Sequence, residues 1–269
     1  MHGREWSVNS KTRIDLLAAE VVLYACRPEA ACQTRLAQNA KWTDGSTKGY
    51  HQVMSQTSHA ETAGVQRLTR KGQATRDRIV EAAAGLMFRQ GVAGTTTEQV
   101  QAAAGVSSSQ IFHYFADKRA LVRAVIAYQT EATLTAQQPL GRLDSMEALR
   151  AWADLFVSIE EQLDCVGGCP IGSLGSELAE TDAAARQDVE RGFARWEGAI
   201  RDGLRAMYAR GDLRRSADPD ALALALLTAL EGGLLMTQIR RDPAPLRAVL
   251  DVVLAHIESL TPRRGRTSQ

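Results

Sequence analysis

The segment 75–121 constrains the fold more than any other part of this 269-residue chain. Apolar residues recur there at helical spacing in short runs, and the runs are separated by glycine or by side chains that cap helices. Gly91 ends the first run and Gly105 ends the second, while Ser107 and Asp117 stand where the next helices begin. This punctuation predicts two short helices joined by a tight turn and flanked by longer helices.

The rest of the chain also favours helices over strands. Alanine is abundant, aromatic residues make up only 5% of the chain, and no long alternating pattern of β-branched residues occurs. Apolar periodicity and capping signals predict helices over about 144–163, 171–180, 182–210 and 221–239, and a last helix through Leu260. The predicted fold class is all-α: a three-helix head with a helix-turn-helix, and a larger helical domain.

The helix predicted over 221–239 has more apolar surface than one contact can cover. Asp218-Pro219 is a clear start signal, and residues 221–230 are apolar nearly all round. The last helix carries an apolar stripe made of Leu246, Leu250, Val253, Ile257 and Leu260. Two adjacent helices of this kind predict a contact with a second copy of the chain. The alternative is one well-buried core helix.

Charge is distributed unevenly along the chain. The net charge is +1, but residues 65–128 carry nine basic and four acidic side chains, whereas residues 129–269 carry 16 basic and 21 acidic ones. A basic block beside an acidic block suits a head that binds a polyanion and a body that avoids it. Two solvated domains of different charge would give the same numbers.

The spacing of these elements is that of a helix-turn-helix, in which Gly105 permits the turn and Ala102, Ala103 and Ala104 allow close helix packing. The stretch TRDRIVEAAAGLMFRQGVAGTTTEQVQAAAGVSSSQIFHYFADKRAL, residues 75–121, resembles the DNA-binding domain of the TetR family over its whole length. The resemblance implies a ligand-responsive repressor that binds a palindromic operator in double-stranded DNA as a homodimer through its last two helices. Residues 1–70 would be a poorly ordered extension, 71–121 the DNA-binding domain, 122–262 the ligand-binding and dimerisation domain, and 263–269 a flexible tail.

The same resemblance assigns roles to individual residues of the head. The groove-facing set would be Ser107, Ser108, Ser109, Gln110 and His113. Gln110 is the best candidate for reading a base, because its amide can pair with adenine through two hydrogen bonds. The expected phosphate contacts are Thr75, Arg76, Thr96, Tyr114 and Lys118, with Arg70 and Lys71 as a flexible basic arm. Ile111, Phe115 and Leu121 are expected to be core residues.

The head departs from the family pattern at three positions. Phe112 stands where tyrosine is usual, so we expect it to pack rather than to contact phosphate. Gln101 replaces a small residue at the contact between the two short helices, and Glu98 stands where a basic residue is common. These changes leave the fold prediction intact and bear on the affinity for DNA.

The larger domain offers candidates for an effector site. Six residues can line a cavity for a small lipophilic molecule, because they are bulky and apolar, contain sulfur or, in one case, place an acid in an apolar helix. They are Trp152, Phe156, Cys169, Trp196, Glu231 and Met236. Each of the apolar ones taken singly is more often a core residue. Glu231 interrupts the most apolar helix and is either exposed or a buried acid that awaits a ligand or an arginine.

The segment CVGGCPIGSLGSELAE, residues 165–180, carries two cysteines near a helix start. Gly167-Gly168 breaks a helix, and Cys169 precedes Pro170 at the beginning of the next one, a position that can lower a thiol pKa. The segment also resembles, more loosely, one branch of TetR regulators that respond to small lipophilic compounds. Cys165 and Cys169 therefore allow a second hypothesis, a thiol-switched redox regulator. Two inert thiols are the plainer interpretation, and the lack of a nearby histidine argues against a metal site.

Residues 1–70 lack sustained periodicity except for one possible helix over 13–25. We hypothesise that translation starts at Met54. The apolar run 14–26 contains Asp15 and Glu20 and is too short and too charged to span a membrane, so we expect a cytoplasmic protein with reduced cysteines. A helical enzyme is a remote alternative, because the sequence shows no catalytic triad, metal cluster or phosphate-binding loop. We expect no cofactor.

Overall fold

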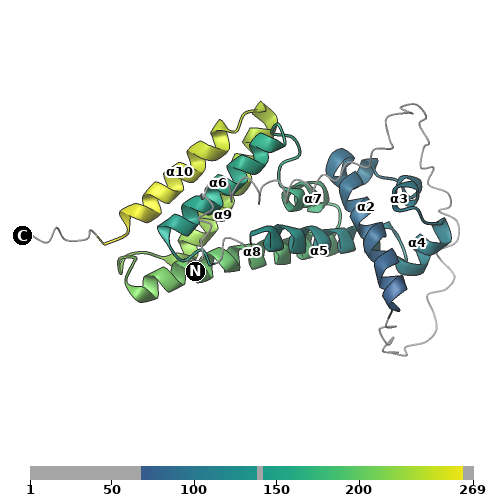
Figure 1. Ribbon diagram of the computed structural model, residues 1–269, viewed down its shortest axis with the longest axis horizontal. Helices are drawn as coiled ribbons and strands as arrows, with labels where there is room; N and C mark the ends of the chain where they lie inside the picture. The colour runs from purple at the N-terminus through teal and green to yellow at the C-terminus, as the bar shows by residue number, and fades with distance from the viewer. Residues whose placement is uncertain (1–67, 138–141, 263–269) are drawn as a thin grey trace, which may run out of the picture. The chain divides into compact units, whose positions relative to one another are not determined.

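In the computed structural model, residues 68–137 and 142–262 are described, and these residues form helices without any strand (Figure 1). The expectations for residues 1–67, including Met54, and for the tail fall outside the described residues. The residues described from Thr75 onward belong to one compact unit.

Three helices make up the head. The helix α2 (Arg70–Gly94) is broken at Gly91, whose φ of 76° is left-handed. The pair α3 (Thr97–Ala104) and α4 (Ser108–Tyr114) forms the helix-turn-helix. Gly105, with φ 62° and ψ 43°, ends α3 in the left-handed conformation that glycine adopts without steric cost. The turn predicted at Gly105 is therefore confirmed.

The head core forms where the sequence predicted it. Ile111, Phe115 and Leu121 are each less than 5% exposed, and they lie in one cluster with Ile79 and Val100. Thr96 and Ser107 each cap the following helix with their hydroxyl oxygen. In both cases the side chain of a glutamine three residues later accepts a hydrogen bond from the backbone N–H of the capping residue. These capping boxes fix where α3 and α4 begin.

Six further helices make up the body. They are α5 (Lys118–Gln137), α6 (Met146–Gln162), α7 (Pro170–Leu178), α8 (Ala183–Arg210), α9 (Pro219–Arg240) and α10 (Ala244–Ser259). The bounds of α6 to α9 agree with the predicted ranges to within two residues. Asp218 accepts hydrogen bonds from Asp220 N–H and Ala221 N–H and so caps α9, with Pro219 at its first position.

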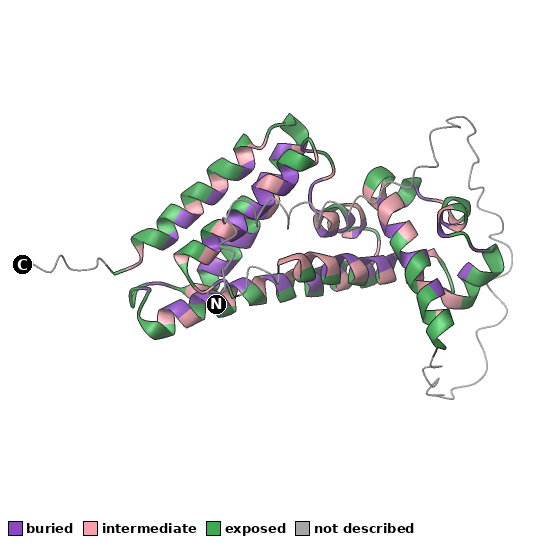
Figure 2. Ribbon diagram, viewed as in Figure 1, coloured by how far each residue is buried: buried purple, intermediate pink, exposed green. Residues whose placement is uncertain are grey.

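Helix α9 packs against both α8 and α10, and α8 also packs against α5 and α7 (Figure 1). The buried side of α9 includes Leu226 and Leu230, both fully buried, and these leucines join the core of the body. The other side of α9 is exposed (Figure 2). By length and composition alone, helix α9 could span a membrane, but its buried side belongs to a helical core.

Candidate nucleic-acid interface

The helix α4 presents its polar side chains to solvent. Ser108, Ser109, Gln110 and His113 are exposed, whereas Ile111 on the opposite side is 3% exposed and anchors the helix in the head core. The residues expected to face a DNA groove therefore lie together on one exposed surface. A helix of this width fits the major groove.

The oxygen and the nitrogen of the Gln110 side chain differ in their hydrogen bonds. Its Oε1 accepts a hydrogen bond of 2.9 Å from Ser107 N–H, which completes the capping box of α4. Across the described residues, no hydrogen bond is found for its side-chain nitrogen. The nitrogen can donate to a base at once, whereas a two-bond contact with adenine requires the oxygen to leave the cap.

Three serines at the start of α4 form hydrogen bonds through their hydroxyl groups. Ser108 Oγ donates to Gln101 Oε1 over 2.6 Å, so the glutamine at the contact of the two short helices binds across it. Ser107 Oγ and Ser109 Oγ are 2.9 Å apart. All five residues of the groove-facing set are exposed: Ser107, Ser108, Ser109, Gln110 and His113.

One aromatic residue at the end of α4, Phe112, does not lie where the sequence predicted. Phe112 is 60% exposed, so the prediction that it packs is wrong. It lies on the exposed side of α4 because the buried side is already filled by Ile111 and Phe115. His113 is exposed and contacts the half-buried Tyr114 edge to face, with the ring centroids 4.9 Å apart. Phe112 offers an apolar surface where the family pattern has a hydroxyl.

The expected phosphate-binding residues lie in different environments. Thr96 is the cap of α3, and its hydroxyl accepts from Gln99 N–H at 3.3 Å. Thr75 is 8% exposed and so has little surface to offer. The guanidinium of Arg76 lies over the Phe115 ring at 5.2 Å from the centroid, a contact that orients this cation on the head.

Lys118 lies between the head and the body. Its Nζ donates to Val92 O over 2.6 Å. Burial lowers the pKa of this ammonium, and the nearby Glu177 carboxylate opposes that effect. Lys118 is thus bound to the backbone through one of its three N–H donors, and the other two can still contact a phosphate.

Sequence reasoning missed the residue that joins α7 to the head. Glu177 on α7 accepts hydrogen bonds from Val92 N–H at 2.7 Å and from Ala93 N–H at 2.6 Å. The break of α2 at Gly91 exposes these donors, and a side chain at Gly91 would lie 3.1 Å from the Glu177 carboxylate. We call this arrangement, with Lys118, the Glu177 clamp.

Comparison with known proteins gives the family. Residues 79–125 match the model of bacterial regulatory proteins of the tetR family, and residues 145–253 match the tetracyclin repressor-like C-terminal domain. A TetR transcriptional regulator from Chloroflexus aurantiacus is 30% identical in sequence, with a TM-score of 0.63 over 72% of this chain and 98% of that one. The chain belongs to the TetR family.

Other relatives agree with this assignment. The HTH-type transcriptional repressor DhaR of Mycobacterium sp. (strain GP1) is 28% identical over 188 residues, which cover 70% of this chain and 92% of that protein. The transcriptional regulator AcuR of Cereibacter sphaeroides is 28% identical over 63% of this chain and 79% of its own length. These relatives are transcriptional regulators rather than enzymes, and so is this TetR-family chain.

Five of the six effector candidates of the TetR-type body fall into two groups. Trp152, Phe156 and Trp196 form one aromatic cluster, with ring centroids 5.1 and 5.6 Å apart. Both indole N–H groups donate to the same oxygen of Gln137, at 2.8 and 3.0 Å. Met236 joins neither group, because its side chain is 38% exposed on α9.

Cys169 and Glu231 form the second group. The Cys169 thiol bonds to the Glu231 carboxylate, and Glu231 Oε1 is buried without a hydrogen-bond partner. Burial raises the Glu231 pKa to about 7, and the bond from Cys169 opposes the rise. Glu160, 2% exposed, has a pKa raised to about 7 by burial alone.

The expected lowering of the Cys169 pKa is wrong. Burial and the Glu231 charge raise the pKa of Cys169 well above its ordinary value, and they outweigh the N–H groups at the start of α7. Burial also raises the pKa of Cys165. Both thiols are free and buried, and no group of three or more metal-binding side chains occurs in the part of the chain that the structure describes.

The buried Glu231 predicts a pH-dependent stability. Because its pKa is about 7 when folded and 4.5 ordinarily, the folded chain holds a proton between these values that the unfolded chain has lost. The free energy of unfolding therefore falls as pH rises through this window. We expect Glu231→Gln to remove this fall, up to about 3 kcal/mol, as measured by urea unfolding at several pH values.

Glu190→Gln, at an exposed position of α8, is the matched control and should keep the wild-type slope. Glu160 contributes equally to all three proteins. Identical pH slopes for the wild type and Glu231→Gln would contradict a buried, protonated Glu231.

Proposed function

We propose that this regulator is a homodimeric repressor in the cytoplasm, that it binds a palindromic operator through α4, and that it releases DNA when a small lipophilic effector binds to the body. The strongest support is the exposed polar surface of α4, set on a head whose sequence carries excess positive charge. A relative named as a repressor, DhaR, supports the direction of control.

Positive charge gives the head affinity for DNA, and hydrogen-bonding groups give it sequence specificity. Basic residues give affinity that depends on salt and not on sequence, because they neutralise phosphates and release counterions. Ser109, Gln110 and His113 can reach base edges, because they are exposed on α4. Gln110 is the residue we assign to base reading.

Replacement of Gln110 tests this assignment. Gln110→Ala should weaken binding to the cognate site by about 1–3 kcal/mol and leave binding to unrelated DNA nearly unchanged. The measurement is fluorescence anisotropy at several salt concentrations, first with DNA from upstream of the chain's own coding region and with unlabelled competitor DNA.

The matched control is Gln187→Ala at an exposed position of α8, which should bind as the wild type does. Because Gln110 also caps α4, Gln110→Glu tests the cap separately: it keeps a capping oxygen and removes the donor. Equal loss of affinity for cognate and unrelated DNA in Gln110→Ala would contradict base reading by this residue.

Helices α9 and α10 support the dimer. Four apolar side chains on these two helices are more than half exposed: Leu224, Leu235, Ile239 and Val252. On α9 the small residues Ala221, Ala225 and Gly232 continue the same exposed side, so backbones can approach closely. Soluble monomers rarely leave such a stripe uncovered. A second copy related by two-fold symmetry would cover it with the same surface.

Charged substitutions in this stripe test the dimer. Leu235→Glu combined with Val252→Glu should convert the protein from twice the chain mass of 29.2 kDa to the monomer, because unpaired carboxylates would be buried in the contact. Sedimentation velocity measures the mass. Ala194→Glu, on the exposed side of α8, is the control and should remain dimeric. A monomeric wild type would contradict the proposal.

An effector acts only if it binds one arrangement of the two heads better than the other. The Glu177 clamp is a direct bond between body and head through which such a preference can be transmitted. The thiol-switch alternative gains no support, since a thiol with a raised pKa is a poor nucleophile at neutral pH.

A further inference from the structure

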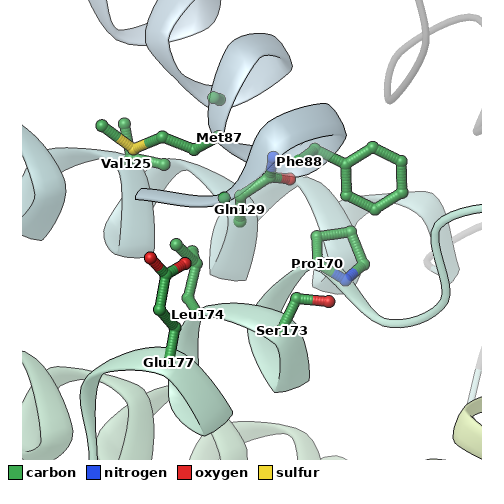
Figure 3. Close-up of a pocket in the computed structure, with 10 residues that line it drawn as sticks. Met87, Phe88, Val125, Gln129, Pro170, Ser173, Leu174 and Glu177 are labelled. Atoms are coloured by element: carbon green, nitrogen blue, oxygen red, sulfur yellow. The ribbon is translucent and has the colours of Figure 1, made fainter. Parts of the chain in front are cut away.

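A cavity of about 120 Å³ lies among α2, α5 and α7, beside the Glu177 clamp (Figure 3). Helix α7 lines it with Ser173, Leu174 and Glu177, and Met87 and Phe88 of α2 line it as well. It contains none of the six effector candidates that the sequence nominated. It is therefore a separate candidate site at the contact between head and body.

Gln129 is a polar residue in the wall of this cavity. The residue is 6% exposed and lines the cavity from α5, yet its side-chain amide has no hydrogen bond to any described residue. Because this amide faces the cavity without a partner among the described residues, a molecule bound there can form hydrogen bonds with it. The amide can both donate to and accept from a hydroxyl or a carbonyl group.

Size and charge limit what can bind there. A dry engineered cavity of about 150 Å³ in another protein holds benzene, so this cavity suits roughly four to six non-hydrogen atoms. Met87, Val125 and Leu174 favour an apolar body. The Glu177 carboxylate on the same wall disfavours an anion.

We propose that this cavity binds a small uncharged alcohol, with its hydroxyl group on the Gln129 amide and its alkyl chain against Met87 and Leu174. If the proposed function holds, the site identifies the class of effector. A molecule in the cavity adjoins Glu177 and can change the bonds from Val92 and Ala93 that hold the head.

The probe is 1-butanol, and the protein is the full chain labelled with ¹³C in its methionine methyl groups. We expect the Met87 signal to shift saturably with 1-butanol, while the signals of Met207, buried in α8, and Met236, exposed on α9, stay in place. Met87→Leu assigns the signal. Ser173→Phe, from an exposed position on the rim, should fill the cavity and abolish the shift.

Two variants complete the test. Ser176→Phe lies on the same helix, does not line the cavity and should bind as the wild type does. Gln129→Leu should weaken 1-butanol roughly fivefold through the lost hydrogen bond. Equal shifts at all methionines, or an unchanged shift in Ser173→Phe, would overturn the site.

Operator binding is measured separately in the same proteins. We expect 1-butanol to lower the affinity of the wild type for its DNA and to leave that of Ser173→Phe unchanged. Saturable binding at Met87 without any change in DNA affinity would overturn the regulatory role. A protein that binds 1-butanol but no DNA would instead contradict the proposed function, so the two failures are distinguishable.

Discussion

The Glu177 carboxylate binds the two backbone N–H groups that follow the break of α2 at Gly91, and Lys118 binds the carbonyl of the same peptide segment. These bonds join a helix of the body to the helix that supports the DNA-reading pair. Charge-assisted hydrogen bonds such as these are shorter and stronger than hydrogen bonds between neutral groups. They tie the end of α7 to the backbone of α2.

Helix α7 begins beside two buried titratable groups. Its first residues adjoin Cys169 and Glu231, and a side chain at Gly172 would lie 2.6 Å from the Glu231 carboxylate. The middle of the same helix lines the cavity with Gln129, and its end carries Glu177. One short helix thus contacts the Cys169–Glu231 pair at its start and the backbone of α2 at its end.

Most of the helix boundaries were predictable because they depend on local chemistry. Asp117, Ser107 and Asp218 cap helices with their own side chains, and Gly105 allows the turn, so neighbouring residues decide each case. The exposed side of α4 was predictable for the same reason, because the residue types within this short helix decide which side faces solvent. The hydrogen bond that Ser107 N–H donates to Gln110 Oε1 follows from the capping-box spacing of these two residues.

The interactions that position the head were not predictable from the sequence. Glu177 binds Val92 across 85 residues, and no periodicity relates two such positions. The Cys169 pKa depends on Glu231, 62 positions further along the chain, and this effect with burial reverses the local influence of the helix start. Phe112 is exposed because it lies on the solvent side of α4, whereas Ile111 is the residue of that helix that enters the head core.

Hydroxyl-radical footprinting on DNA selected by the purified protein tests the central claim most directly. A two-fold dimer that reads DNA with both α4 helices predicts two protected half-sites with inverted sequence, centred about 34–36 Å apart or at a multiple of that distance. A single asymmetric half-site, or protection without sequence preference, would contradict a symmetric dimer that reads its operator through α4.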